Sequence, residues 1–261
     1  MLITTCNVNG IRAAQRKGFC EWVARKRPDV LCLQETKAKV HQLSEGLTAP
    51  AGYHAYYHDA EKPGYSGVAL WSRGAPDRII EGIGWEDFDA EGRFIQADFG
   101  KLSVISLYLP SGTTGEVRQG VKYDFMDRFT EWFGHIRRKR RHYILCGDLN
   151  IAHTEKDIRN WRSNKKSSGF LPEERAWLDR LFGELGFVDA FREYTDEPDH
   201  YTWWSNRANA WANNVGWRID YQVLSPRLKG SVREADIYRE EKFSDHAPLS
   251  IRYDFGGVSG L

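Results

Sequence analysis

The segment Tyr143-Ile144-Leu145-Cys146-Gly147-Asp148-Leu149-Asn150 joins four apolar residues directly to a glycine, a carboxylate and an amide. The apolar run predicts a buried β-strand, and its polar end is typical of the turn that terminates one. A second polar segment, Ser244-Asp245-His246, lies near the C-terminus. Each segment alone is explained by a strand-terminating turn. Together they supply carboxylate, amide and imidazole groups, which metal-assisted attack on a phosphodiester requires.

Two further apolar runs end in the same way. The run 2–6 is followed by Asn7-Val8-Asn9-Gly10, and the run 30–33 by Gln34-Glu35-Thr36. An Asn-Gly pair is an ordinary turn signal, and an isolated Glu after a strand is usually solvated. Because strand ends converge on one rim of an α/β sheet, four such endings favour a single polar site at that rim.

Length and composition set limits on the architecture. A chain of 261 residues with 41% hydrophobic content can build one substantial core, and we expect a single domain over 1–255 followed by a flexible, glycine-rich tail at 256–261. No stretch approaches the roughly 18 apolar residues of a membrane span, and the N-terminus begins a strand instead of a signal sequence. These features predict a cytoplasmic protein with no membrane association.

The charged and sulfur-containing residues are less informative. The formal net charge is +1, so any nucleic-acid surface must arise from local segregation of 37 basic and 36 acidic residues. The four cysteines show no metal-binding spacing, and three lie in apolar runs where a reduced thiol packs as a small hydrophobe. A disulfide framework is therefore not expected.

The apolar patterns predict an α/β fold. Strands are expected at 2–6, 30–33, 53–57, 67–71, 93–99, 102–108, 142–147, 219–224 and 248–253, and helices near 15–27, 118–138 and 173–184. Short turns join some neighbouring strands and helices separate others. This combination indicates mixed sheets.

The chain resembles a known family through seven segments in the family's order. These are Cys6-Asn7-Val8-Asn9-Gly10-Ile11-Arg12, Leu33-Gln34-Glu35-Thr36-Lys37, Gly67-Val68-Ala69-Leu70, Leu107-Tyr108-Leu109-Pro110, Gly147-Asp148-Leu149-Asn150-Ile151-Ala152-His153, Gly216-Trp217-Arg218-Ile219-Asp220-Tyr221 and Ser244-Asp245-His246-Ala247-Pro248. They resemble the exonuclease III class of abasic-site endonucleases. The resemblance implies a single catalytic domain with a four-layer endonuclease/exonuclease/phosphatase-type fold: a two-sheet mixed β-sandwich flanked by helices, with the active site at one edge.

The resemblance also implies a metal centre. Glu35 matches the principal metal carboxylate, with Asn7 and Asp245 around it. Oxygen ligands suit a hard cation such as Mg²⁺, with Mn²⁺ as a substitute, and no Cys/His cluster suggests zinc.

The remaining catalytic roles follow the same correspondence. Asp148 matches the base that takes a proton from the attacking water, and Asn150 the group that orients it. His246 matches the imidazole that contacts the scissile phosphate, with Asp220 as its carboxylate partner. Tyr108, before a Pro-Ser-Gly loop, matches a phenol that donates to the phosphate. By pattern alone, Asp220 could equally be an edge-strand surface residue, and a tyrosine at a strand end is usually a packing residue.

The segment 157–170 is basic, amide-rich and aromatic, and its composition also fits a solvated connection. In the family this region lies against DNA, which implies contacts from Asn164, Ser167, Lys165 and Lys166. Ser167 stands where many relatives have a second Asn, and Ser168 where many have Ala. A hydroxyl lacks the reach of an amide, so these departures bear on the balance of endonuclease and exonuclease activity.

Tryptophans are dense over 203–217, and the family resemblance implies that some of them line a pocket for the bare sugar of an abasic site. Trp203 and Trp217 are the expected walls, with Ile219 as a further apolar contact. Some tryptophans in this region must simply belong to the core. Arg12 and Lys37 are expected to contact phosphates, because they sit beside the catalytic strand ends.

The run Arg137-Arg138-Lys139-Arg140-Arg141 has the composition of a nucleic-acid-binding segment. However, cations at this position also complement the carbonyl end of the preceding predicted helix. We therefore read it as a solvated face.

The leading hypothesis is a magnesium-dependent, monomeric DNA repair hydrolase. It would act on double-stranded DNA with abasic sites or damaged 3′ ends, cutting 5′ to the abasic site, with 3′–5′ exonuclease and 3′-phosphatase activity as additional expectations.

A non-enzymatic nucleic-acid-binding regulator is the alternative. The chain is also similar to the catabolite repression control proteins, notably at 137–141, 169–179 and 216–224. Those regulators lack parts of the catalytic set, which is intact here. A third option is hydrolysis of a phosphorylated lipid or another small molecule within the related phosphodiesterase superfamily.

Overall fold

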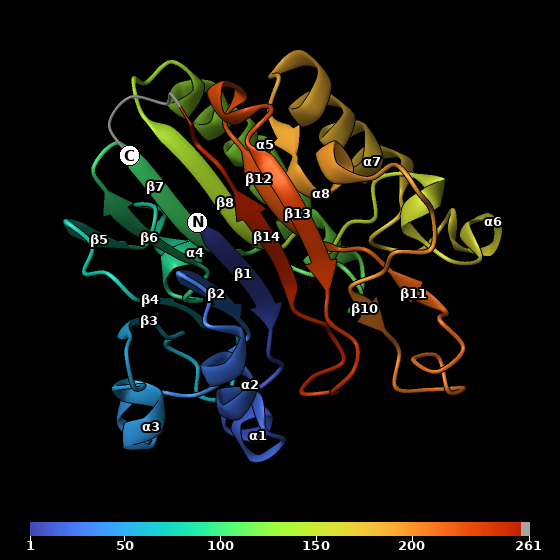
Figure 1. Ribbon diagram of the computed structural model, residues 1–261. Helices are drawn as coiled ribbons and strands as arrows, with labels where there is room; N and C mark the ends of the chain where they lie inside the picture. The colour runs from blue at the N-terminus through green and yellow to red at the C-terminus, as the bar shows by residue number, and fades with distance from the viewer. Residues whose placement is uncertain (257–261) are drawn as a thin grey trace.

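Two six-stranded mixed sheets face each other in the computed structural model, which describes residues 1–256 (Figure 1). The first has the order β13-β14-β1-β2-β4-β3, and the second β5-β6-β7-β8-β12-β9. Only β1–β2 and β7–β8 are parallel pairs among the described strands of these sheets. The expected mixed sandwich is confirmed.

The strands of the first sheet are β1 (Leu2–Asn7), β2 (Val30–Gln34), β3 (His54–His58), β4 (Val68–Ser72), β13 (Val232–Ile237) and β14 (Leu249–Tyr253). Those of the second are β5 (Arg78–Glu81), β6 (Phe94–Phe99), β7 (Leu102–Tyr108), β8 (His142–Asp148), β9 (Val188–Asp189) and β12 (Asp220–Leu224). A separate ribbon is formed by β10 (Trp203–Trp204) and β11 (Gly216–Trp217).

The helices are α1 (Ile11–Arg16), α2 (Phe19–Lys26), α3 (Glu45–Thr48), α4 (Glu86–Asp89), α5 (Glu116–Arg137), α6 (Trp161–Asn164), α7 (Pro172–Asp179) and α8 (Ala190–Tyr194). Short 3₁₀ turns lie at Val40–Gln42, Glu155–Asp157 and Pro226–Leu228, and a π-helical segment, Arg180–Glu184, continues α7.

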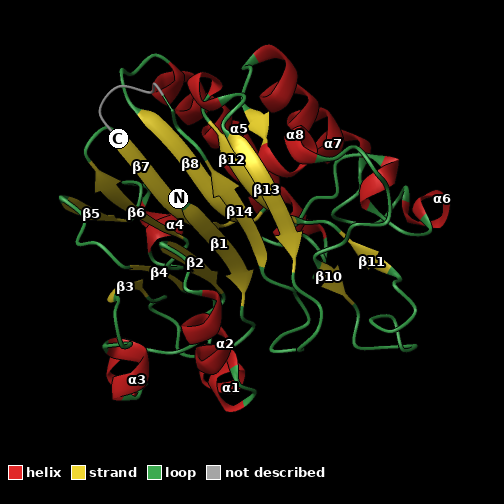
Figure 2. Ribbon diagram, viewed as in Figure 1, coloured by secondary structure: helices red, strands yellow, loops and turns green. Residues whose placement is uncertain are grey.

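The strand β8 explains why the chain forms four layers. Its side chains alternate between faces, so Ile144 and Cys146 enter the cluster between the sheets while Tyr143 and Leu145 enter the cluster beneath α5 and α7. Both faces are buried, which is why the run is continuously apolar. On the other sheet, α1 and α2 cover the outer face through the cluster that contains Phe19. Figure 2 shows the helices on the two outer faces.

Several expected boundaries change. The single helix expected at 15–27 is wrong: it is two helices, because Gly18 has a φ of 87° and breaks the pattern. The strands β5, β9 and β13 were not predicted. β13 reads Val-Arg-Glu-Ala-Asp-Ile and lies at a sheet edge, so it has no apolar run to reveal it. Of the expected flexible tail at 256–261, residues 257–261 lie outside the described part of the chain.

No helix among the described residues combines the length and apolar content needed to cross a bilayer.

Candidate active site

Sheet register brings the predicted polar residues together. In the second sheet, Asp148 pairs with Tyr108 on one side and with Asp220 on the other. In the facing sheet, Asn7 is the last residue of β1 and pairs with Gln34, the residue before Glu35. An isolated bridge joins Trp203 to His246. The four polar endings seen in the sequence therefore meet at one edge of the sandwich.

Three of the site residues, Glu35, Lys37 and Asn150, have left-handed backbone conformations. Glu35 has a φ of 51° and Asn150 a φ of 53°, a region that costs free energy for a side chain other than glycine. Local hydrogen bonds hold both. The carbonyl of Glu35 accepts from the Gly10 amide at 2.7 Å. The Asn150 amide donates to Asp148 Oδ1 at 2.8 Å, and its side-chain Nδ2 donates to the Leu109 carbonyl at 2.8 Å.

Asn7 links the carboxylates of the two sheets. Its Nδ2 donates to Glu35 Oε1 at 2.7 Å and to Asp148 Oδ2 at 2.9 Å. Lys37 forms an ion pair with the other oxygen of Glu35 at 2.6 Å. Burial opposes ionisation of Glu35, but Lys37 and the Asn7 hydrogen bond together hold the pKa of Glu35 below its ordinary value. Glu35 is therefore an anion at neutral pH.

Asp148 lies in a different environment. It is buried, and burial raises its pKa; the neighbouring Asp220 carboxylate adds to the effect, and the result is a pKa of about 7. A carboxylate that exchanges a proton near neutral pH is suited to general-base catalysis.

His246 and Asp220 form the expected pair. His246 Nδ1 lies 2.8 Å from Asp220 Oδ2, and its Nε2 lies 3.9 Å from Asp148 Oδ2. Burial alone would lower the pKa of His246, but the Asp220 and Asp148 carboxylates raise it to about 10. The imidazole is therefore cationic at neutral pH, and its Nε2 faces the side on which Asp148 lies.

Asp245 is held at the rim of the site. Its Oδ2 accepts from Trp203 Nε1 at 3.1 Å, and its Oδ1 accepts from Asn9 Nδ2 at 2.9 Å. Burial raises the pKa of Asp245, but the cationic His246 and the hydrogen bonds from Asn9 and Trp203 together outweigh this, and the pKa is lowered. Asp245 thus adds a third anionic group beside Glu35 and Asp148.

Among the described residues, one cluster is close enough together to hold a metal ion. Single ligand atoms of Glu35, Asp148 and His246 all lie within 4.8 Å of one another. Of the three expected ligands, only Glu35 belongs to this cluster. Asn7 joins it through its amide hydrogens, and its Oδ1 accepts from the Asn9 amide at 3.0 Å.

A cavity of about 790 Å³ opens over this cluster. Most of the predicted site residues line it: Glu35, Lys37, Tyr108, Asp148, Asn150, Asn164, Ser167, Trp203, Trp217, Ile219, Asp245 and His246. Asn7 and Asp220 are fully buried beneath the groups they support. Arg12, Lys165 and Lys166 are exposed and lie outside the cavity wall. Lys165 instead sits over the Trp161 ring at 4.8 Å.

Trp203 and Trp217, which were predicted as the walls of a pocket, both line this cavity. Trp203 and Trp217 pair across β10 and β11, and their rings meet edge to face at 6.1 Å. Both are half-buried and pack with Ile219 against a small apolar cluster. The cavity is therefore lined by apolar side chains as well as by the charged groups.

The loop 111–115 forms another wall, which sequence reasoning missed. Its Pro-Ser-Gly start, noted after Tyr108, was the available signal.

The phenol of Tyr108 is buried, and burial together with the Glu35 and Asp148 carboxylates raises its pKa well above the ordinary value. Tyr108 therefore remains a hydrogen-bond donor.

A buried ion pair behind the cavity was also missed. The side chains of Lys122 and Glu174 are both fully buried and paired. Lys122 Nζ also donates to the Asn150 carbonyl at 2.9 Å, and Glu174 accepts from the Gly169 amide at 2.6 Å. This pair fixes the segment after β8 to α5 and α7.

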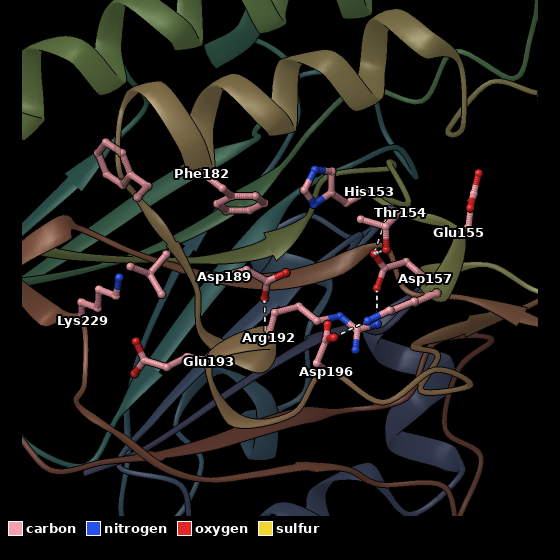
Figure 3. A pocket seen from close by; sticks show the side chains of 13 residues that line it. His153, Thr154, Glu155, Asp157, Phe182, Asp189, Arg192, Glu193, Asp196 and Lys229 are labelled. Atoms are coloured by element: carbon pink, nitrogen blue, oxygen red, sulfur yellow. Dashed lines mark hydrogen bonds and ion pairs between the residues drawn. The ribbon is translucent and has the colours of Figure 1, made fainter.

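A second cavity, of about 550 Å³, is lined by a different set of residues that includes Asp157, Asp189 and Arg192 (Figure 3). On its wall, Asp157 Oδ1 accepts from Arg192 at 2.6 Å, and the same oxygen accepts from Arg218 at 2.7 Å. Burial disfavours the Asp157 anion, but Arg218 and Arg192 hold the pKa of its carboxyl well below the ordinary value. Because Arg218 stands two residues before Asp220, this network helps to hold the strand that carries Asp220.

Known proteins similar to this chain in sequence and in structure are nucleases or members of their family. The family model described as "Endonuclease/Exonuclease/phosphatase family" matches residues 4–246. An exodeoxyribonuclease of Bacillus subtilis is 40% identical over 253 residues, covering 96% of this chain and 98% of its own. The DNA repair nuclease APEX1 of Danio rerio is also 40% identical, over 96% of this chain and 81% of its own. A solved 3′–5′ exonuclease of Neisseria meningitidis superposes with a TM-score of 0.89 at 27% identity, covering 98% of this chain and 100% of its own.

Proposed function

This chain belongs to the endonuclease/exonuclease/phosphatase family, and from that premise we propose that it is a metal-dependent DNA repair phosphodiesterase. It hydrolyses the backbone of double-stranded DNA 5′ to abasic sites, and it also acts on damaged 3′ ends as a 3′–5′ exonuclease and 3′-phosphatase. The relatives named as exodeoxyribonuclease and DNA repair nuclease support the enzyme class. The intact catalytic set argues against the non-enzymatic regulator.

One observation carries the proposal. Glu35 and Asp148, with depressed and raised pKa values respectively, lie beside the cationic His246 at the floor of one cavity. A phosphodiester placed there would meet a fixed anion for a metal, a base able to exchange a proton, and a hydrogen-bond donor for its oxygens.

The chemistry of these residues fits a hard divalent cation. Glu35 is ionised, Asp148 is close to it, and Asn7 and Asp245 add oxygen atoms nearby. We propose that Glu35 is the principal ligand of Mg²⁺, with Asn7 and Asp245 around it, and that Mn²⁺ can substitute. When bound, the cation supplies positive charge at the scissile phosphate.

Asp148 is the proposed general base. Its Oδ1 is already engaged by the Asn150 amide, and its Oδ2 accepts from Asn7 and faces His246. These contacts fix the carboxylate so that it can take a proton from a water directed at phosphorus. Asn150 is the proposed orienting group, because its side chain is itself held by the Leu109 carbonyl.

His246 and Tyr108 are the proposed phosphate contacts. Asp220 holds the imidazole through Nδ1, which leaves Nε2 free to donate to an anionic oxygen. The Tyr108 phenol retains its proton and lines the same cavity. Both groups are in position to stabilise negative charge on the reacting phosphate.

The apolar wall is the proposed specificity element. Trp203, Trp217 and Ile219 would receive the bare sugar, whereas a normal nucleotide would have to bring its base. Asn164, Ser167, Lys165, Lys166, Arg12 and Lys37 are proposed contacts to the flanking phosphates. Residues 1–255 are proposed to act as one catalytic domain, in a cytoplasmic monomer.

The substitution Asp148→Asn tests the proposal. We expect incision of an abasic-site duplex to fall by about 10²- to 10⁴-fold, which is the usual contribution of a general base, while binding of the duplex is retained. Asp124→Asn, at a carboxylate on α5 that is 57% exposed, is the matched control and should leave activity unchanged. Equal activity of the Asp148→Asn protein would refute the assigned base.

A metal titration separates the enzyme from the regulator. Incision should disappear on chelation and return with Mg²⁺ or Mn²⁺, and Glu35→Gln should raise the metal concentration needed for half-maximal activity. Parallel rates on an abasic duplex, a recessed 3′ end and a 3′-phosphate would establish the dominant activity. Nucleic-acid binding with no cleavage under any metal would favour the regulator instead.

A further inference from the structure

A group of cations lies at the far end of β8 from the catalytic cavity. It is formed where α5 ends, where β7 and β8 begin, and where the turn after β12 returns. The residues of this distal basic patch are Lys101, Arg137, Arg138, Lys139, Arg140 and Arg227, all exposed.

Hydrogen bonds show that these segments are neighbours. The His142 amide donates to the Lys101 carbonyl at 2.9 Å, which places the start of β7 beside the end of the basic run. Tyr143 and Ser225 are joined by two hydrogen bonds of 2.8 and 3.0 Å. Arg227 follows two residues later, so three separate segments bring their positive charge to one end of the sheet.

Within residues 1–256, no acidic side chain forms an ion pair with the charges of the patch. None of its six side chains forms an ion pair or a hydrogen bond with any residue in the described part of the chain. The neighbouring Arg141 shows the contrast, because it pairs with Asp98 at 3.1 Å and donates to Ser103 at 2.6 Å. The exposed Asp77, which accepts from the Gly100 amide at 2.7 Å, is a nearby acid.

The buried His142 gives a second indication of an anion site. Its Nδ1 is buried and has no hydrogen-bond partner among the described residues. Burial lowers the pKa of His142, and the nearby Arg227 and Lys101 lower it further. An anion between these groups would offset the mutual repulsion of the cations.

The side chains of the patch indicate which kind of negatively charged partner it binds. The exposed large apolar side chains of the described residues are Met1, Val40, Val117, Val121, Tyr194 and Val215, and none belongs to the patch. A protein interface normally has an apolar or aromatic centre, and stable attachment to a membrane surface needs an apolar insertion as well as charge. Exposed cations without such a centre fit a phosphate backbone.

The position of the patch separates it from the catalytic cavity. The strand β8 runs from His142 beside the patch to Asp148 in the site, a distance of about 20 Å at 3.3 Å per residue. We propose that the distal basic patch binds the phosphate backbone of a second segment of duplex DNA, distinct from the segment held at the catalytic cavity. It retains the protein on long DNA and plays no part in bond cleavage.

Binding through phosphates has a measurable signature. Each phosphate contact adds about 0.9 to the slope of log affinity against log salt. Neutralising three of the cations in Arg138→Gln/Lys139→Gln/Arg140→Gln should therefore reduce the slope by up to about 2.7. At about 0.1 M salt, affinity for long DNA should fall at least tenfold.

The experiment compares this triple variant with the parent on two undamaged duplexes, one several hundred base pairs long and one about 15 base pairs long. A matched variant, Lys26→Gln/Arg233→Gln/Arg252→Gln, removes the same charge from side chains that are already paired with acids. We expect the patch variant to lose affinity and salt slope on the long duplex, and the matched variant to keep both. Incision of a short abasic duplex should be the same for all three proteins.

Several results would overturn the proposal. An unchanged salt slope on the long duplex would show that the patch makes no phosphate contact. Equal losses on both duplexes would show that the patch contacts the same DNA segment as the catalytic cavity. Binding to acidic vesicles but not to long DNA would show that the patch binds a membrane surface. Because undamaged duplex binding is measured without cleavage, a protein inactive on abasic DNA would refute the proposed function without affecting this result.

Discussion

Replacing Lys122 with Met should destabilise the protein far more than removing a surface cation. Both side chains of the Lys122–Glu174 pair are fully buried, so the substitution leaves a carboxylate in the interior without its counter-charge. Removing one partner of a buried ion pair typically costs about 3–5 kcal/mol. For a domain of this size that corresponds to a fall in Tm of about 6–20 °C.

The magnitude rests on how many contacts remain. Glu174 would still accept from the Gly169 amide at 2.6 Å and from the Leu171 amide at 3.0 Å, so part of its charge stays solvated by backbone groups. In Lys122→Met/Glu174→Gln, the amide oxygen can keep both backbone hydrogen bonds while neither side chain is charged. We therefore expect the double variant to be more stable than Lys122→Met alone, although it carries one more substitution.

Urea unfolding, followed by tryptophan fluorescence and circular dichroism, measures these free energies. Arg128→Met on the same helix is the control, because its ion pairs lie at the surface and should contribute about 0–1 kcal/mol. A loss below about 1 kcal/mol for Lys122→Met, or strictly additive losses in the double variant, would refute the reasoning that the pair is buried and coupled.

Three further outcomes follow from the site. Gly147→Ala should cost at least about 3 kcal/mol in thermal unfolding, because the added Cβ would lie 1.8 Å from a backbone carbonyl of β7; a native-like Tm would contradict this. Trp203→Phe removes the hydrogen bond to Asp245 together with part of the indole packing, and should lower stability by at least about 1.5–3 kcal/mol, as urea unfolding would show. The pKa of His246 is raised to about 10, so the stability it contributes is fully present below about pH 6.5 and is lost as pH rises through 10. His246→Gln or Asp220→Asn should flatten the dependence of unfolding free energy on pH in that window, and an unchanged slope would show that the pair does not set it.

The positions of the proposed reacting groups could be predicted because each lies close to one end of an apolar run. Glu35, Asp148 and His246 are close to strand ends, and strand ends meet at one edge in a sandwich. The family resemblance then assigned roles that a carboxylate or a tyrosine does not reveal by itself. Tyr108 is the clearest case, because its place beside Asp148 depends on the parallel register of β7 and β8.

Strands could be predicted from the sequence where both of their faces are buried. The strand β8 is apolar at successive positions because both of its faces are covered. The edge strand β13 and the two-residue strand β9 have no such signal, since one is polar and the other is too short for a period to appear. The break between α1 and α2 depends on the left-handed conformation of Gly18. The apolar periodicity continues across this glycine, so the sequence pattern predicted a single helix.

The groups that hold the site could not be predicted, for a physical reason. A lysine or arginine in a helix or strand pattern is normally placed at the surface, because burying its charge alone is prohibitive. Lys122 and Arg218 are fully buried only because Glu174 and Asp157, at distant positions in the chain, lie opposite them.

These buried pairs are attached to the segments that carry the proposed reacting groups. Lys122 donates to the carbonyl of Asn150, and Arg218 stands two residues before Asp220. A buried ion pair contributes little net stability compared with apolar packing, since desolvation offsets most of the attraction. What it does supply is a single permitted geometry, because any displacement leaves a charge unpaired. The placement of these pairs directly behind the catalytic strand ends is therefore better explained by the need to hold the site rigid than by a contribution to overall stability.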